Sequence, residues 1–266
     1  MSRLPVFILI AACFFTQPVF VQGQSSSDDD FSLVDAYYLG RAVAANILAA
    51  YKPYTGNPEA TRYLNEICQT LIINSSLPPA FNGYHVMILD SNEFNAFATT
   101  GGHIFLTKRL IESANSEDML AAVIAHELSH IAKRHSIIVI NEMRFTAEMS
   151  SIANRASSLA GAPNSASLFR DSISTTMDTL MKVGYSKNQE YEADMDAVVM
   201  LRRAGYHPNA LLDMLNILQR QSMTQKSGLF STHPSPAERI ANVQGLQIRV
   251  TDTRQYRESR FKNIKF

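Results

Sequence analysis

The sequence has few cysteines and no excess of charge of either sign, and each shortage excludes a class of protein. Cys13 and Cys68 are its two cysteines, and Cys13 lies in the apolar N-terminal segment. If that segment is removed, Cys68 stands alone, so we expect no intrachain disulfide and interpret Cys68 as a buried core thiol. Lysines plus arginines number 24, as do aspartates plus glutamates. A nucleic-acid-binding protein usually has a basic excess, so we expect no nucleic-acid partner.

The sequence also lacks the motifs of two large enzyme classes. It contains no Gly-x-Ser-x-Gly nucleophile elbow and no phosphate-binding loop. Serine-hydrolase and nucleotide chemistry therefore have no support. With 11 glycines, 10 prolines and 46% hydrophobic residues, the composition is that of an ordinary globular protein. A length of 266 residues suffices for one substantial domain.

The first 23 residues have the layout of a secretory signal peptide. Arg3 precedes an apolar run at 4–20, and Val21-Gln22-Gly23 supplies compact residues for cleavage. We expect residues 1–23 to be removed and the polar residues 24–30 to form a flexible linker, which predicts an exported protein. Two alternatives stay open, lipidation at Cys13 and retention as an anchor. The interrupted run is a poor match to the roughly 20 apolar residues of a spanning helix.

The rest of the chain predicts an α+β domain that is predominantly helical. Helical patterns cover residues 31–51, 58–73, 137–184, 187–204 and 208–221, and a short helix begins near residue 236. A further helix, which Asn115 or Ser116 can cap, has apolar residues at helical spacing from Leu120 to Ile131. Two β-rich stretches, 84–89 and 103–107, lie on either side of a Thr100-Gly101-Gly102 turn. Two short strands cannot bury a core alone, so helices must cover a face of the small sheet. No later segment is apolar enough to cross a bilayer, so we expect no transmembrane domain after signal removal.

Domain boundaries follow from the same patterns. We place the domain at residues 31–251 and interpret residues 252–266 as a polar tail that contributes nothing obvious to the core. Residues 136–186 are expected to cover the active site and gate access to it. The methionines of that segment could equally be core filler. They are Met143, Met149, Met177 and Met181.

Residues 126–130 read His-Glu-Leu-Ser-His within an apolar helix. His126 and His130 are four apart, so both imidazoles lie on one face and can bind one tetrahedral zinc ion. Glu127 then lies beside the open coordination position, where it can accept a proton from water. The alternative is a chance pair of histidines, but unpaired polar groups in such apolar surroundings would be costly.

A catalytic zinc ion needs a third protein ligand. Glu190 and Asp194 are four apart on a second predicted helix and share a face, whereas Glu192 points away. We expect Glu190 to bind the metal and Asp194 to accept the outer N–H of a ligand histidine, which fixes its tautomer. The alternative is a solvated acidic face. The ligands and Glu127 together predict zinc-dependent hydrolysis of internal peptide bonds.

Several segments in a fixed order resemble the zinc metallopeptidase family that includes the CAAX prenyl proteases, HtpX and BepA. The resemblance covers residues 33–243 and implies a zincin-type domain with one zinc ion per chain. Its segments are Asn95-Ala-Phe-Ala, Gly101-Gly102-x-Ile104-Phe105, residues 123–130, Tyr185-Ser-x-x-x-Glu190-x-Glu-Ala-Asp194, and Ser231-Thr-His233-Pro-Ser-Pro-x-x-Arg239-Ile240.

The resemblance implies roles for residues beyond the ligands. The strand after the Gly-Gly turn would be an edge strand to which a substrate segment adds as a further strand. His233 would lie near the zinc ion, where it would either stabilise the oxyanion or occupy the fourth coordination position and hold the enzyme latent. Arg239 would orient the segment that carries His233. The substrate-binding residues would be Gly102, His103, Ile104 and Phe105.

The resemblance also implies substrates, partners and a compartment. Unfolded or misassembled proteins would be the substrates, envelope or outer-membrane assembly machinery a partner, and the periplasm the compartment, with membrane association left open. Two departures weaken parts of this expectation. Lys187 stands where relatives usually have arginine, which removes a bidentate contact. The tetratricopeptide repeats of BepA have no counterpart in the sequence, so docking through such repeats is not expected.

Two competing hypotheses share the same site. One is a zinc-stabilised chaperone or assembly factor for envelope proteins with latent proteolysis, and the other is a small-peptide aminopeptidase. Glu127 favours an enzyme over the chaperone, because a protein that only binds has no need for a general base. The remaining histidines, His85, His135 and His207, are interpreted as structural or solvated rather than as ligands.

Overall fold

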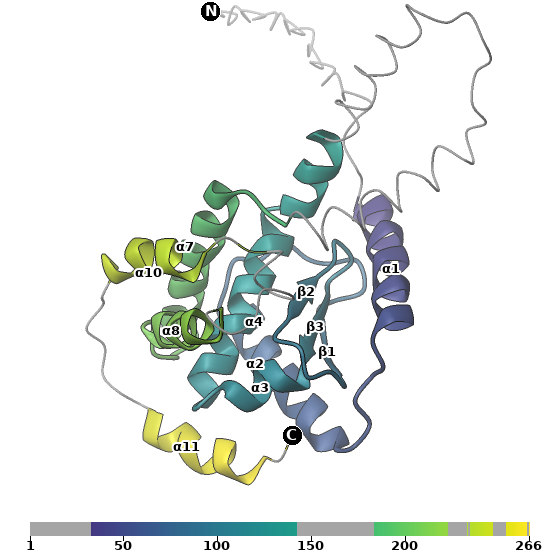
Figure 1. Ribbon diagram of the computed structural model, residues 1–266. Helices are drawn as coiled ribbons and strands as arrows, with labels where there is room; N and C mark the ends of the chain where they lie inside the picture. Colours follow the sequence, from purple (N-terminus) through teal and green to yellow (C-terminus); the bar gives the residue numbers. More distant parts are fainter. Residues whose placement is uncertain (1–32, 143–183, 223–232, 234, 247–253, 265) are drawn as a thin grey trace, which may run out of the picture. The chain divides into compact units, whose positions relative to one another are not determined.

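The computed structural model describes residues 33–142, 184–222, 233, 235–246, 254–264 and 266 (Figure 1). The predicted signal peptide, the linker and most of the gating segment lie outside these residues. Within the described ranges, no helix combines the length and the apolarity needed to cross a bilayer.

Helices dominate these ranges, and one small sheet lies among them. The helices are α1 (Leu33–Ala50), α2 (Pro58–Ile73), α3 (Lys108–Ser113), α4 (Glu117–Ala132), α7 (Lys187–Arg203), α8 (Ala210–Ser222), α10 (Pro236–Gln244) and α11 (Arg254–Asn263). The strands are β1 (His85–Leu89), β2 (Ala96–Ala98) and β3 (His103–Thr107). The predicted α+β class with a helical majority is confirmed.

The sheet has the strand order β1-β3-β2, so β3 is its central strand. β1 runs parallel to β3 with His85 opposite His103, and β2 runs antiparallel with Phe97 opposite Phe105. The chain reverses between β2 and β3 at the predicted glycine turn. Gly102 has a φ of 89° there, and a Cβ atom at this position would lie 2.3 Å from the Gly83 carbonyl oxygen. Only glycine fits both the backbone angle and the space.

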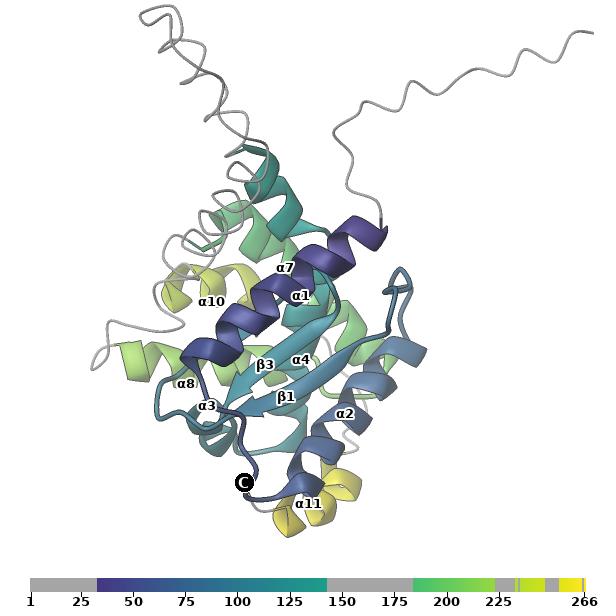
Figure 2. The ribbon, with the colours of Figure 1, turned by 90° about the vertical axis from the view of Figure 1, so that its right-hand side faces the viewer.

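Each face of the sheet packs against a different set of helices. In β3, Ile104 and Leu106 belong to the main core with α2, α4, α7 and α8, whereas Phe105 between them belongs to a second core. Because successive side chains of a strand point to opposite faces, the sheet separates the two cores. Val43 and Ile47 of α1 pack against Phe105, and Figure 2 shows α1 lying across this face.

Serine caps set where the two site-bearing helices begin. The Ser116 hydroxyl accepts a hydrogen bond from the Met119 N–H at the start of α4. At the start of α7, Ser186 and Gln189 form a reciprocal capping box. Such caps satisfy backbone N–H groups that have no partner inside the helix, so they fix which residue occupies each turn.

Two short elements and the C-terminal helix differ from the prediction. β2 and α3 have only three and six residues, too few to show a clear period. The prediction that residues 252–266 contribute nothing to the core is wrong. Phe261, Ile264 and Phe266 pack against the main core from α11 and the residues after it.

Buried ion pairs hold α11 to the start of α4. Glu117 is 1% exposed, and its carboxylate accepts hydrogen bonds from Tyr63 Oη at 2.7 Å, Tyr206 Oη at 3.1 Å and Arg260 Nε at 2.8 Å. The neighbouring Asp118 forms an ion pair with Arg257 at 2.7 Å. The sequence of α11 is polar because it contains several arginines. Two of these arginines, Arg257 and Arg260, neutralise the buried carboxylates of Asp118 and Glu117.

We predict that Arg260→Met destabilises the fold by about 1–3 kcal/mol, because the buried Glu117 carboxylate loses charged hydrogen-bond donors. Lys262→Met is the matched control, since the Lys262 side chain on the same helix is 73% exposed and pairs with the exposed Glu258 at 3.3 Å. It should change the free energy of unfolding by less than about 0.5 kcal/mol.

Chemical denaturation gives the free energy of unfolding of both variants. Adding Glu117→Gln to Arg260→Met should recover part of the lost stability, because the uncompensated charge is gone. Equal stability of the Arg260 and Lys262 variants would contradict the prediction.

Candidate metal centre

Two helices carry facing pairs of side chains four residues apart. α4 presents His126 and His130, and α7 presents Glu190 and Asp194. A spacing of four places each pair on one helical face, one turn apart. All four are at most 4% exposed. The packing of α4 against α7 therefore brings together side chains that are 60 or more positions apart in sequence.

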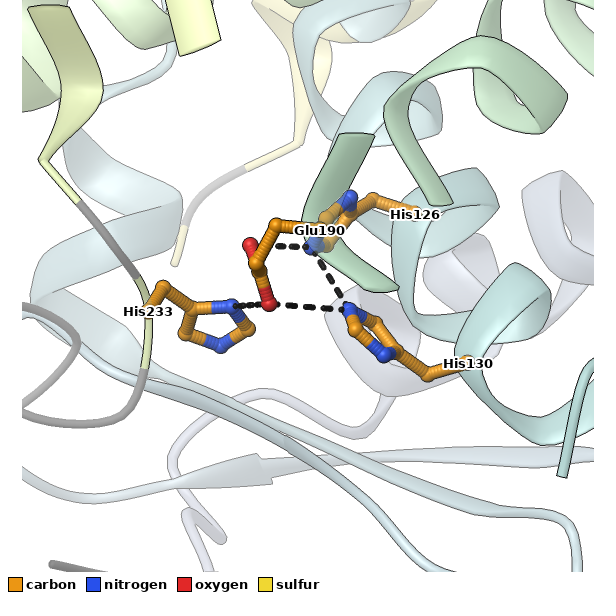
Figure 3. Close-up of side chains that lie close together, drawn as sticks. All are labelled: His126, His130, Glu190 and His233. Carbon is orange, nitrogen blue, oxygen red and sulfur yellow. Dashed lines mark hydrogen bonds and ion pairs between the residues drawn. The ribbon is translucent and has the colours of Figure 1, made fainter. Parts of the chain in front are cut away.

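His126, His130, Glu190 and His233 meet in one cluster (Figure 3). Nε2 of His126 lies 3.1 Å from Nε2 of His130. Glu190 Oε1 lies 3.2 Å from His130 Nε2 and 2.7 Å from His233 Nδ1, and Glu190 Oε2 lies 3.5 Å from His126 Nε2. Among the described residues, this group offers one ligand atom each, all within 4.8 Å of one another.

The cluster fits a tetrahedral metal ion. Two nitrogens bound at about 2.05 Å in tetrahedral geometry are about 3.3 Å apart, close to the observed spacing of the two Nε2 atoms. Nδ1 of His126 faces Asp194 and Nδ1 of His130 faces His135, so in the neutral rings both Nε2 lone pairs point into the cluster. Glu190 Oε2 is buried and accepts no hydrogen bond within the described residues. A cation bound at this place would satisfy the two Nε2 atoms and Glu190 Oε2.

Asp194 and Arg239 form a layer behind the cluster. Asp194 Oδ1 lies 3.0 Å from His126 Nδ1, the position from which it accepts that ring's outer N–H. Arg239 of α10 donates to both carboxylate oxygens of Asp194 at 2.5 and 2.8 Å. Its Nη1 also lies 3.1 Å from Glu190 Oε2. Arg239 therefore links α10, and the residues just before it, to both acidic side chains of α7.

The charges of this layer keep both carboxylates ionised. Burial acts to raise the pKa of Glu190, but the charges of His233 and Arg239 outweigh it and hold this pKa well below its ordinary value. Burial likewise opposes ionisation of Asp194, yet the Arg239 charge and hydrogen bonds lower its pKa to about 2. A metal ion would find two anionic groups at neutral pH.

The two histidines respond differently to the same surroundings. Burial and Arg239 act to lower the pKa of His126, but its contacts with Asp194 and Glu190 outweigh them and raise it to about 9. Burial lowers the pKa of His130 to about 3. The carboxylates that favour a proton on His126 also attract a metal cation, which competes with that proton for Nε2.

Glu127 is 2% exposed and lines a small pocket together with His126 and His233. Burial raises the pKa of its carboxyl group, against the opposing charges of His233 and His126. A carboxylate with a raised pKa is a better proton acceptor at neutral pH than an exposed one. The arrangement can therefore support general-base chemistry beside the ligand cluster.

His135 and Tyr185 contact the cluster, and the sequence interpretation missed this. His135 is 1% exposed, and its Nδ1 lies 3.0 Å from Nδ1 of His130. The Tyr185 ring stacks on His130 with centroids 3.9 Å apart. The sequence interpretation placed His135 off the metal-binding face because it lies five residues after His130, next to Lys133 and Arg134. Instead α4 ends at Ala132 and Arg134 has a φ of 55°, which turns His135 back toward His130.

The prediction that β3 is an edge strand is wrong, and Gly102, His103, Ile104 and Phe105 are not edge residues. β2 pairs with β3 on one side and β1 on the other, so the backbone of β3 is already hydrogen-bonded. The strand beside the cluster is β2, whose Ala96 lines the same pocket as Glu127 and His126. Asn95 and Thr99 bond to the strand residues opposite them, so the backbone groups of Ala96 and Ala98 point away from β3.

Residues 58–247 match peptidase family M48. This stretch includes every residue of the cluster and covers most of the chain. The chain belongs to peptidase family M48. The family accounts for the cluster as the metal centre of a metallopeptidase domain and agrees with the family resemblance seen in the sequence.

Several relatives of this M48 chain are proteases. The beta-barrel assembly-enhancing protease of Escherichia coli K12 is 27% identical over 197 residues, which is 72% of this chain and 40% of that protein. The mitochondrial metalloendopeptidase OMA1 of Schizosaccharomyces pombe is 28% identical over 74% of this chain and 54% of its own length. Metalloprotease LoiP of E. coli K12 is 27% identical over 71% of each chain. The chain thus spans about two fifths of the first of these relatives.

We predict that Glu190→Gln and His130→Ala abolish stoichiometric zinc binding, because each removes a ligand from the cluster. Asp194→Asn should keep the ligands but weaken zinc affinity by about 10–100-fold, since the tautomer of His126 is no longer held. Asp196→Asn is the matched control on α7, because Asp196 pairs with Lys133 at 3.2 Å and does not contact the cluster.

Zinc content after dialysis against a weak chelator, measured by mass spectrometry, distinguishes these variants. Circular dichroism should show that each variant is folded. A Glu190→Gln protein that holds one zinc ion per chain as tightly as the parent would exclude Glu190 as a ligand.

Proposed function

We propose that this M48 chain is a zinc-dependent endopeptidase that cleaves unfolded or misassembled exported proteins. The observation that carries the proposal is the buried cluster of His126, His130 and Glu190 with Glu127 next to it. Two histidines and a carboxylate are typical ligands of a catalytic zinc ion, which keeps a fourth position for water, whereas structural sites are closed by four protein ligands. In this proposal His233, the fourth member of the cluster, acts on the substrate and does not close the site. The general base beside them supports hydrolysis over binding alone.

In this proposal His126, His130 and Glu190 hold the zinc ion. When bound, zinc supplies Lewis acidity that makes water a better nucleophile and polarises the scissile carbonyl. Glu127 takes the proton from the attacking water and then gives it to the departing amine nitrogen. Asp194 and Arg239 hold the ring of His126 and the carboxylate of Glu190 in place. All these groups are buried, so few water molecules compete for their hydrogen bonds.

We propose β2 as the strand that binds substrate. Ala96 and Ala98 direct their backbone groups away from β3, and the Ala96 N–H donates to Asn95 Oδ1 at 3.0 Å. An extended peptide can add to this edge as a further strand through the Ala96 C=O and the Ala98 N–H and C=O. Recognition through the backbone requires an extended segment, which unfolded proteins offer and folded proteins do not. It also gives little sequence selectivity by itself, as quality control of diverse substrates requires.

The compartment and partners are part of the same proposal. The apolar N-terminal run and the compact residues after it support export, and we propose the periplasm as the destination. The name of the E. coli relative associates that protein with the assembly of β-barrels. We extend this to envelope or outer-membrane assembly machinery as the context in which this chain meets its substrates.

We predict that Glu127→Gln lowers kcat for casein by about 10²–10⁴-fold while zinc content stays at the parent level, because the proton acceptor is lost and the ligands remain. Glu66→Gln is the control, since the Glu66 side chain on α2 is 57% exposed and distant in sequence from the cluster. Fluorescent casein, with and without a chelator, gives the rates, and added zinc should restore the chelated parent.

The outcomes separate the hypotheses. Equal cleavage by Glu127→Gln and parent would end the assignment of Glu127. If neither protein cleaves casein while both hold zinc and bind unfolded casein, the chaperone hypothesis replaces the endopeptidase. Mapping the cleavage products separates an endopeptidase, which cuts inside the chain, from an aminopeptidase, which trims one end.

His233 has a second test, because two roles were expected for it. We propose that it stabilises the oxyanion that develops on the scissile carbonyl, and its Nδ1 lies 2.7 Å from Glu190 Oε1, within the cluster. His233→Ala should then lower kcat by about 10²–10³-fold with little change in zinc content. A rise in activity instead would identify His233 as a ligand that holds the enzyme latent.

A further inference from the structure

A small apolar pocket adjoins Glu127 on the side of the cluster that faces α8. Leu211, Met214, Leu215 and Leu218 of α8 line it together with Val123 and Glu127 of α4. Val123 and Glu127 are four apart, so they share one face of α4. The same helical face therefore offers an apolar surface first and the proton acceptor one turn later.

The pocket is narrow. Its volume is about 20 Å³, and Met214 and Leu215 are each only 1% exposed. A cavity of about 10–15 Å³ holds one water molecule, so this space suits a group of methyl size. His126, Glu127, His233 and Arg239 also line it, but most of its lining is leucine, methionine, valine and alanine, so the part away from these polar groups favours an apolar group.

The pocket also lies against the proposed substrate strand. Ala96 of β2 and His126 both line it, so it is bounded by the edge strand on one side and by the ligand cluster on another. In an extended peptide paired with β2, successive side chains point to opposite sides. A peptide whose scissile bond is next to Glu127 would direct one of its neighbouring side chains into this space.

We propose that this pocket is a specificity subsite for the residue that flanks the scissile bond, and that it selects a small apolar side chain such as alanine. The inference rests on the proposed endopeptidase function and names a preference that this function alone does not require. Met214 and Val123 both line the pocket, so the size of each side chain limits the group that the pocket accepts. The pairing with β2 accepts many sequences, and this subsite restricts where within them cleavage occurs.

A peptide library with both residues around the cleaved bond varied, analysed by mass spectrometry, tests the preference. The parent should favour alanine over phenylalanine by at least about tenfold in kcat/KM at one fixed flanking position, since one methylene in an apolar pocket changes this ratio by about 10–200-fold. Met214→Ala enlarges the pocket and should shift the preference toward leucine or phenylalanine. Val123→Leu narrows it and should increase discrimination against anything larger than alanine.

Met195→Ala is the matched control, because Met195 on α7 is 39% exposed and does not line the pocket. Its preference should equal that of the parent. Thermal unfolding and zinc content show which variants are folded, and Val123→Leu keeps the test decisive if Met214→Ala does not fold. A second readout is the binding of peptides that differ only by alanine or phenylalanine to the zinc-loaded Glu127→Gln variant.

The results distinguish failure of this inference from failure of the proposed function. Cleavage that depends on Glu127 but shows no size preference, or a preference unchanged in a folded Met214 or Val123 variant, overturns the subsite and leaves the endopeptidase intact. If no peptide is cleaved, the endopeptidase fails. The subsite then stands only if Glu127→Gln binds the alanine peptide more tightly and Val123→Leu in that background strengthens the difference.

Discussion

The site depends on one electrostatic constraint: α7 places two carboxylates, Glu190 and Asp194, in the buried interior of the protein. Both are 0% exposed. Burying a charge without a partner costs several kcal/mol per ion in a folded protein, so these groups need compensating charge nearby. Arg239 supplies one positive charge to the pair. The remaining negative charge attracts either a proton on His126 or a cation, and it would be the physical origin of the proposed zinc affinity.

The same constraint explains why three helices converge. α4 gives the rings, α7 gives the carboxylates, and α10 gives the guanidinium that satisfies them. If α10 shifted away, Asp194 would lose both of its hydrogen bonds from Arg239 and the hold on His126 Nδ1 would weaken. His233, close to α10 in sequence, is brought to Glu190 by the same attachment. The helix that neutralises the site thus also brings in its third histidine.

Sequence reasoning reached the residues whose positions follow from a regular helix. His126 with His130 and Glu190 with Asp194 are i,i+4 pairs, and the structure brings all four together. It failed where the chain leaves regular geometry. The left-handed turn at Arg134 changes the direction of His135, and a three-residue strand inserts beside β3 with too few residues to be recognised.

Sequence reasoning also failed for charged residues whose partners are buried. Arg257 and Arg260 suggested a solvated tail, because composition cannot show that their partners are the buried Asp118 and Glu117 of another helix. The pairing of the strands poses a similar problem. The hydrophobic pattern of β3 is the same for a central strand and an edge strand when helices cover both faces, so only the register with β2 decided the question.

The helices outside the M48 match complete the scaffold on which the site rests. α1 and α11 lie before and after residues 58–247, yet α1 covers Phe97 and Phe105 on one face of the sheet, and α11 neutralises the first turn of α4. Without α1, those two phenylalanines would face water on the strands nearest the cluster. Without α11, α4 would begin with two uncompensated buried carboxylates. The helix that carries His126, Glu127 and His130 is therefore held at its start by α11 and nearer its end by the contacts of the ligand cluster. The flanking helix α11 and the candidate catalytic residues thus stabilise the position of the same helix, α4.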